Sequence, residues 1–222
     1  MANERDLEKL LQANPYPGRG IVLGRSADGG RVVIAYFIMG RSENSRNRIF
    51  VPTDDGIRTE AYDPSKLEDP SLIIYHPVRT MGDALVVTNG DQTDTIVEEN
   101  DFFRGCLKRR FEPDGPNFTP RISSVLHPDG SFAISILKHA ETEADECTRE
   151  FFVYEGVEEG AGYFISTYQG DGNPLPSFAG EPIKVTMPEP DEVWAALNKD
   201  NKVSLYTNVE GTVRLFNARE GE

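Results

Sequence analysis

Cysteine is scarce in this chain of 222 residues, and long apolar runs are absent. Two cysteines, Cys106 and Cys147, do not make a disulfide framework, which excludes a small disulfide-stabilised secreted domain and favours a cytoplasmic location. No apolar run approaches the roughly 18 residues that a membrane-spanning helix needs. The segment from Met1 to Asn14 carries charges throughout, so we do not expect it to act as a signal peptide.

Sequence motifs of the common cofactor and metal sites are also missing. The chain has no glycine-rich phosphate loop before a helix, no paired-cysteine zinc spacing and no His-Glu-x-x-His. Its histidines, His76, His127 and His139, lie far apart in the sequence, so we expect no metal site. Cys106 falls on the apolar face of an expected helix, which favours a small core side chain over a nucleophile.

Acidic residues outnumber basic ones by 37 to 23, which gives the chain a net charge of −14. A surface with that excess repels polyanions, so we expect neither nucleic acid nor an anionic membrane as a partner. The segment from Arg19 to Arg48 is the exception, because it holds six arginines, two acids and no lysine, a local charge of +4. These arginines either bind a small anion or lie solvated at the surface.

Short apolar runs separated by turn residues predict a protein built mainly from strands. The expected strands cover residues 21–23, 32–38, 49–51, 72–75, 84–88, 121–126, 132–137, 150–154, 163–168, 203–207 and 212–216. The expected helices cover residues 5–14, 92–110 and 191–198, and the second can break near Asn100. Strands that follow one another in runs indicate an α+β fold, with two mainly antiparallel sheets packed together, helices outside, and residues 1–222 in a single domain.

Four polar stretches stand out at the ends of the expected strands. They cover residues 16–19, 40–48, 88–94 and 117–121, and the last follows Glu112 and Asp114. Polar groups at strand ends commonly converge on a binding site. Each stretch alone also fits helix caps, turns and solvated loops.

Taken together and in this order, the stretches resemble the archaeal-type IMP cyclohydrolase family. The resemblance is carried by Tyr16 to Arg19, Arg41-Ser42, Asn47-Arg48, Thr88 to Asp94, Asn117 to Ile122 and Ser166 to Tyr168. It covers residues 16–218 and leaves residues 1–14 as an added N-terminal helix. The family is similar in fold to the N-terminal-nucleophile hydrolases, so the resemblance implies a four-layer αββα sandwich. The chain begins Met1-Ala2, without the Ser, Thr or Cys that the hydrolase chemistry requires, so we do not expect autoprocessed nucleophile catalysis.

The resemblance implies that the protein closes the second ring of a purine, in de novo purine biosynthesis. In that reaction 5-formamidoimidazole-4-carboxamide ribonucleotide loses water and becomes inosine monophosphate. The substrate's own carboxamide nitrogen attacks, so the protein must orient the two reacting groups, which lowers the barrier by about 7–11 kcal/mol at best. It must also stabilise and protonate the departing oxygen. This chemistry requires no metal and no organic cofactor.

The resemblance and the strand-end positions together select the candidate site residues. Arginine matches the geometry of a phosphate, and the candidates for the substrate's phosphate are Arg19, Arg41, Arg48 and Arg121. The candidates for the base and ribose are Asn89, Asp91, Asp94 and Thr119. The candidates for catalysis are Tyr75, at the end of an apolar strand, Glu112, on an irregular loop, and Asn117. Alternatively, Tyr75 is an ordinary core residue, Glu112 lies at the surface, and the arginines form structural ion pairs.

Two other functions stay open on the sequence. One is a purine-nucleotide-binding protein without activity, and the other is an amide hydrolase on the same fold. A small purine ribonucleotide is the expected partner of both the enzyme and the binding protein. Apolar strand edges and the family resemblance also favour a homo-oligomer.

Overall fold

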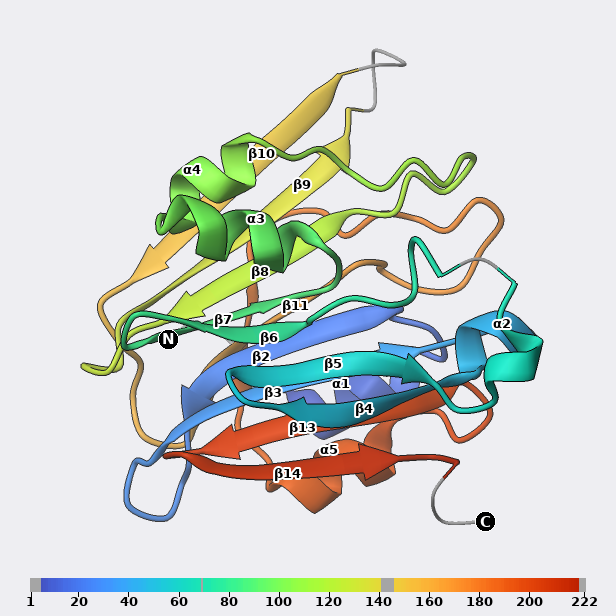
Figure 1. Cartoon of the computed structure of the whole chain (residues 1–222). Coiled ribbons are helices and arrows are strands. Elements are labelled where there is room, and N and C mark those ends of the chain that lie inside the picture. The colour runs from blue at the N-terminus through green and yellow to red at the C-terminus, as the bar shows by residue number, and fades with distance from the viewer. Residues whose placement is uncertain (1–4, 69, 141–145, 220–222) are drawn as a thin grey trace.

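Two seven-stranded sheets, packed face to face, form the centre of the computed structural model, which describes residues 5–68, 70–140 and 146–219 (Figure 1). In spatial order, the first sheet consists of β1 (Arg5–Asp6), β12 (Ile183–Thr186), β11 (Ala161–Ser166), β2 (Arg19–Arg25), β3 (Val32–Met39), β13 (Lys202–Val209) and β14 (Thr212–Asn217). The second consists of β10 (Cys147–Tyr154), β9 (Phe132–His139), β8 (Arg121–Leu126), β7 (Ala84–Thr88), β6 (Val78–Met81), β5 (Gly56–Ala61) and β4 (Arg48–Thr53). Within the described strands, every neighbouring pair is antiparallel except β1 and β12.

Helices cover the outer face of each sheet. Figure 1 shows α3 (Gln92–Glu99) and α4 (Phe102–Leu107) over the second sheet, and α1 (Leu7–Ala13) and α5 (Pro190–Ala196) behind the first. Two shorter helices, α2 (Glu43–Arg46) and the 3₁₀ turn η1 (Pro64–Lys66), lie in connections between strands. Within the described residues, no helix is both long and apolar enough to cross a bilayer.

The alternation of side chains along each strand produces three apolar layers. On β3, Ile34, Tyr36 and Ile38 pack between the two sheets, whereas Ala35 and Phe37 pack against α1 and α5. A third cluster, around Ile96, joins α3 and α4 to the outer face of the second sheet. The expected α+β class and the four-layer αββα sandwich are therefore confirmed. The likeness to the N-terminal-nucleophile hydrolases and the single domain stay predictions.

The two ends of the sandwich differ in their connections. At the left end in Figure 1, hairpin partners such as β2–β3, β8–β9 and β13–β14 are joined by short turns, and Gly130 and Gly211 take the left-handed φ that such turns require. The long connections 40–47, 62–77 and 167–182 lie at the right end, and the connection 89–120 leaves β7 and enters β8 there, although its helices α3 and α4 lie over the second sheet. Most of the polar stretches noted in the sequence belong to this second end, which we call the loop end.

Most expected elements are present, and two of them differ from the prediction. Residues 72–75 form no strand, because the Pro70 carbonyl accepts the backbone N–H groups of Ile73 and Ile74 and closes a turn, so the predicted strand is wrong. The first helix begins at Leu7, where Asp6 caps it, because β1 pairs with β12 just before; residues 1–4 of the expected helix lie outside the described residues. The expected break of the helix over 92–110 is confirmed at Asn100, whose φ of 50° is left-handed.

Candidate active site

Three arginines begin strands at the loop end. Arg19 is the first residue of β2, Arg48 of β4 and Arg121 of β8, and their relative exposures are 9%, 0% and 5%. Each has a buried guanidinium nitrogen without a hydrogen-bond partner among the described residues, and these atoms are Arg19 Nε, Arg48 Nη1 and Arg121 Nε. Buried polar groups are normally hydrogen-bonded, so these N–H groups point to a ligand that accepts hydrogen bonds.

A buried carboxyl, that of Glu112, lies among these arginines. Glu112 is 2% exposed, and its backbone N–H donates to the Thr119 carbonyl at 2.9 Å. Burial is the largest influence on its carboxyl and raises the pKa of Glu112, although the positive charges of Arg19 and Arg121 oppose that rise. Glu112 can therefore hold a proton at a pH where a solvated glutamate has lost it.

Tyr75 brings a hydroxyl to the same group from the 62–77 connection. Its backbone is fixed by Thr59 on β5, whose Oγ1 accepts the Tyr75 N–H at 2.9 Å and whose N–H donates to the Tyr75 carbonyl at 2.9 Å. The side chain is buried, and its hydroxyl lies 2.9 Å from that of Tyr36 on β3. Tyr75 also interacts electrostatically with Arg19 and Arg48.

Arg121 is held from the α3 side. Its Nη1 donates to Gln92 Oε1 at 2.6 Å and lies 2.8 Å from Asp91 Oδ1. Burial acts to raise the pKa of Asp91, but the charges of Arg121 and Arg109 outweigh it and hold that pKa below its usual value. A side chain at Gly90 would collide with this arrangement, because an added Cβ would lie 2.5 Å from Arg121 Nη1.

Asn89 joins the β7–α3 turn to β8. Its Oδ1 accepts the Ile122 N–H at 2.9 Å and the Gln92 Nε2 group at 2.9 Å, and its Nδ2 donates to the Pro120 carbonyl at 2.9 Å. The side chain is fully buried, so these bonds occupy it within the protein. Asn89 thus holds the strand that begins with Arg121.

Asn89→Ala is expected to lower the free energy of unfolding by about 2–4 kcal/mol, because it leaves a buried backbone N–H and a buried carbonyl without partners. Urea denaturation measures the change. Asn198→Ala is the control, because Asn198 accepts one exposed N–H bond, from Asp200, and should cost less than about 1 kcal/mol. Equal losses in the two variants would contradict the structural role of Asn89.

Thr119 and two tyrosines line up beside the arginines. Thr119 Oγ1 hydrogen-bonds to the Tyr168 hydroxyl at 2.5 Å, and its N–H donates to Asp114 Oδ1 at 2.6 Å. Tyr168 stacks on Tyr16, with ring centroids 6.0 Å apart. Arg19 interacts electrostatically with both rings' hydroxyls, so this column borders the arginine group.

Arg41 lies farther out than the other three arginines. Its side chain is 39% exposed and its guanidinium carbon lies 4.9 Å from the centre of the Tyr16 ring. Arg41 Nη1 donates to Asp171 Oδ1 at 2.6 Å and to the Gly172 carbonyl at 3.1 Å. The sequence alternative of an ion pair therefore applies to Arg41 in this structure.

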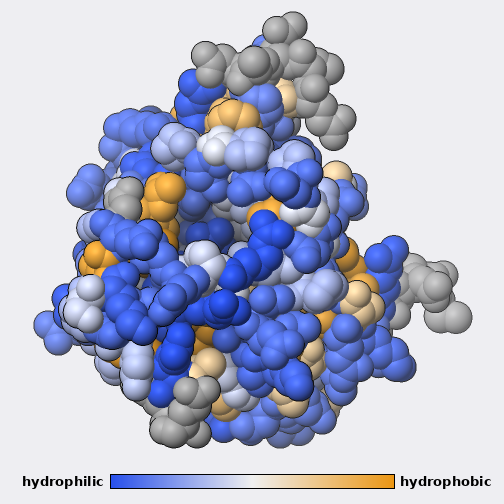
Figure 2. Space-filling view, turned by 90° about the vertical axis from the view of Figure 1, so that its right-hand side faces the viewer, coloured by the Kyte–Doolittle hydropathy of each residue, from blue (hydrophilic) through white to orange (hydrophobic). Residues whose placement is uncertain are grey.

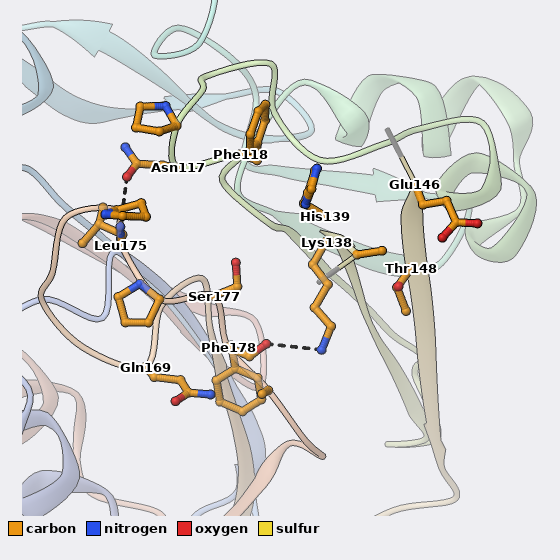
Figure 3. Close-up of a pocket in the computed structure, with 15 residues that line it drawn as sticks. Asn117, Phe118, Lys138, His139, Glu146, Thr148, Gln169, Leu175, Ser177 and Phe178 are labelled. Carbon is orange, nitrogen blue, oxygen red and sulfur yellow. Dashed lines mark hydrogen bonds between the residues drawn. The ribbon is translucent and has the colours of Figure 1, made fainter. Parts of the chain in front are cut away.

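Asn117 lines a cavity of about 720 Å³ at the loop end (Figure 3). Figure 3 shows Lys138 and His139, from β9, across this cavity from Leu175, which belongs to the 167–182 connection, and Lys138 Nζ donates to the Phe178 carbonyl at 3.4 Å. Asn117 Oδ1 accepts the Leu175 N–H at 3.0 Å. None of the three buried arginines lines this cavity.

Asp94 faces a different neighbourhood from Asp91. Its Oδ1 lies 2.9 Å from Arg79 Nη1 and 3.6 Å from His76 Nδ1, and Arg79 Nε lies 2.7 Å from Asp55. These contacts join α3 to β6 and the β4–β5 turn. The Asp94 carboxylate, which the sequence analysis placed at the substrate, therefore pairs with Arg79 in this structure.

The loop end thus presents positive, hydrogen-bonding groups around one buried carboxyl, that of Glu112, whose pKa is raised by burial. Figure 2 looks onto this end and shows a mainly hydrophilic face that is hollowed near its centre. Within residues 5–68, 70–140 and 146–219, no three His, Cys, Asp or Glu side chains form a group that could hold a metal ion. The sequence interpretation missed Tyr36, inside an apolar run, and Gln92, although Gln92 belongs to the recognised 88–94 stretch.

Comparison with known proteins gives a consistent picture. The family model described as IMP cyclohydrolase-like protein matches residues 16–213. IMP cyclohydrolase of Methanococcus maripaludis (strain C7) is 30% identical over 165 residues, which are 69% of this chain and 75% of that protein. IMP cyclohydrolase of Halobacterium salinarum is 32% identical over 131 residues, 55% of this chain and 63% of that protein. IMP cyclohydrolase of Methanosphaera stadtmanae is 28% identical over 169 residues, 69% of this chain and 74% of that protein.

Proposed function

The chain belongs to the IMP cyclohydrolase-like protein family, and from that membership we propose that it is an enzyme that closes the purine ring of 5-formamidoimidazole-4-carboxamide ribonucleotide. The product is inosine monophosphate, and water is released. The observation that carries the proposal is the set of three buried arginines with unpartnered N–H groups around Glu112. A reaction of this kind belongs to purine biosynthesis. We propose that the protein is located in the cytoplasm and forms a homo-oligomer.

The reaction needs a proton to be moved rather than a nucleophile to be supplied. The carboxamide nitrogen attacks the formyl carbon, a C–N bond forms, and the formyl oxygen becomes a hydroxyl as the nitrogen gives up a proton. The C–O bond then breaks, the hydroxyl leaves as water, and the former formamide nitrogen loses its proton. One group that donates a proton to the leaving hydroxyl and recovers one from that nitrogen suffices for the second step.

Glu112 is suited to that relay, because its raised pKa lets it start as a neutral acid. In the proposal it protonates the leaving hydroxyl and then takes the proton from the ring nitrogen. The Tyr75 hydroxyl donates a hydrogen bond to the same oxygen while negative charge develops on it. The fixed positions of both groups, in a buried setting, reduce the reorganisation that the reaction requires.

The arginines supply the binding energy. A phosphate monoester carries about −1.5 to −2 charges near neutral pH, and guanidinium N–H groups bind it through charge-assisted hydrogen bonds. Arg19, Arg48 and Arg121 offer such groups from three different strands. Arg41 can join them only by leaving Asp171. We place Asp91 and Thr119 near the ribose and base, beside Arg121 and Tyr168.

A direct assay tests the proposal. Purified protein is mixed with 5-formamidoimidazole-4-carboxamide ribonucleotide, and the absorbance of the purine product is followed. Turnover supports the enzyme. Tight binding of inosine monophosphate without turnover would instead identify a nucleotide-binding protein, and release of formate would identify an amide hydrolase.

Arg121→Ala is expected to weaken the binding of inosine monophosphate by about 10- to 100-fold, because a charge-assisted hydrogen bond contributes about 1.5–3 kcal/mol. Isothermal titration calorimetry measures the affinity. Arg25→Ala is the matched control, since Arg25 is the exposed last residue of β2, at the end of the sandwich opposite to the loop end. An Arg121→Ala affinity equal to that of the control would remove Arg121 from the phosphate site.

A further inference from the structure

Tyr36 is a buried tyrosine whose hydroxyl meets Tyr75. It lies in the middle of β3, between Ile34 and Ile38, and is completely enclosed. Its ring packs on Phe50, with centroids 5.7 Å apart, as a phenylalanine could. Its hydroxyl lies 2.9 Å from the Tyr75 hydroxyl, and that is the one hydrogen bond of Tyr36 Oη in the described part of the chain.

A hydroxyl buried between two sheets costs free energy unless it is hydrogen-bonded. A phenylalanine at position 36 would fill the same apolar layer without that cost. The Tyr36 hydroxyl therefore serves the hydrogen bond to Tyr75, and the packing of the core does not require it. Burial also raises the pKa of Tyr36 well above its usual value, so this hydroxyl keeps its proton and can donate it in a hydrogen bond.

Two facing hydroxyls can share only one hydrogen bond, and its direction decides where the second proton points. If Tyr36 donates to Tyr75 Oη, the proton of Tyr75 is left for another acceptor. Arg19 and Arg48 interact electrostatically with the tyrosine pair and are donors only, so neither can accept that proton. A substrate oxygen held by these arginines would be an acceptor within the same group.

We propose that Tyr36 is a positioning residue for ring closure: its hydroxyl donates to Tyr75 Oη and thereby directs the Tyr75 proton toward the oxygen that leaves the substrate. This inference rests on the proposed function of the site. It assigns Tyr36 no contact with the substrate. Its effect on the reaction is exerted entirely through Tyr75.

The test is a double-mutant cycle on the ring-closure assay, with Tyr36→Phe, Tyr75→Phe and the double variant. Tyr36→Phe is expected to lower kcat about 10-fold with KM within twofold of wild type, and Tyr75→Phe to lower kcat about 100-fold. In the Tyr75→Phe background, Tyr36→Phe should change kcat by less than twofold, because the hydroxyl it acts through is gone. A merely structural Tyr36 would lower kcat by the same factor in both backgrounds, and that result would overturn the inference.

Tyr206→Phe is the matched control, because Tyr206 pairs with Tyr36 across β13 and β3 and is also buried. Its hydroxyl accepts from Asn208 Nδ2 at 3.2 Å, away from the arginines, so its kcat should stay within twofold of wild type. The affinity of each variant for inosine monophosphate and its thermal midpoint report whether the site is folded. An active wild type with an unchanged Tyr36→Phe overturns this inference alone, whereas an inactive wild type overturns the proposed function and this inference with it.

Discussion

Glu112→Gln is expected to lower kcat for ring closure by about 10²- to 10⁴-fold, while the affinity for inosine monophosphate changes by less than about fivefold. Glutamine has nearly the same shape and stays neutral, as the buried Glu112 carboxyl does when it is protonated. It cannot transfer a proton to the leaving hydroxyl, so the chemical step is lost and binding is kept. Steady-state kinetics and calorimetry separate the two quantities.

The same variant predicts a change in pH dependence. A general acid must carry its proton, so kcat of the wild type should fall as the pH rises through the pKa of Glu112, which burial places above the ordinary glutamate value. The residual rate of Glu112→Gln should lack this decline. Glu60→Gln, at a partly exposed position on β5, should keep both the rate and the decline. If kcat of Glu112→Gln fell with rising pH as kcat of the wild type does, Glu112 would be excluded as the general acid.

Arg48→Met is expected to weaken nucleotide binding by about 10- to 100-fold and yet leave the free energy of unfolding unchanged, or raised by up to about 2 kcal/mol. Arg48 is completely buried, and its described hydrogen bonds go to the carbonyls of Ser45 and Met39. Burial and the neighbouring Arg19 charge lower the pKa of Arg48, which shows that its surroundings disfavour the charge. Methionine fills similar space without a charge to desolvate.

Opposite movements of affinity and stability are the signature of a group kept for function. Urea denaturation in the absence of nucleotide gives the stability, and calorimetry with inosine monophosphate gives the affinity. Arg58→Met, at an exposed site on β5, should leave both near wild type. A large loss of stability in Arg48→Met would mean that Arg48 serves the fold, and the affinity change could then not be assigned to lost phosphate contacts.

The sequence predicts the layers well because local patterns decide them. The alternation along residues 32–38 and the glycine turn at 127–130 are readable without knowledge of their partners, and both lead to the observed strands. The run 72–75 fails for a local reason too, since Pro70 starts a turn that removes its backbone from the sheet. β6 and β12, each four residues long, carry too short a pattern to be detected.

The site is predicted less evenly, because partners decide it. A strand that begins with arginine indicates a polar end, and three such strands do bring Arg19, Arg48 and Arg121 to the loop end. Nothing in the local sequence reveals that Asp171 pairs with Arg41, or that Arg79 pairs with Asp94, since these partners are 130 and 15 residues away. Tyr36 is hidden for the same reason, as its polar partner, Tyr75, comes from the 62–77 connection, 39 residues away.

The short turns between hairpin strands have a practical consequence. Five hairpin turns, β2–β3, β4–β5, β6–β7, β8–β9 and β13–β14, gather at the end of the sandwich opposite to the arginines. Exposed turns of this kind are where inserted peptides and fused domains are best tolerated. An epitope, a fluorescent reporter or a surface anchor inserted at Gly211, in the β13–β14 turn, would project from the end opposite to the loop end. Substrate could still enter at the loop end.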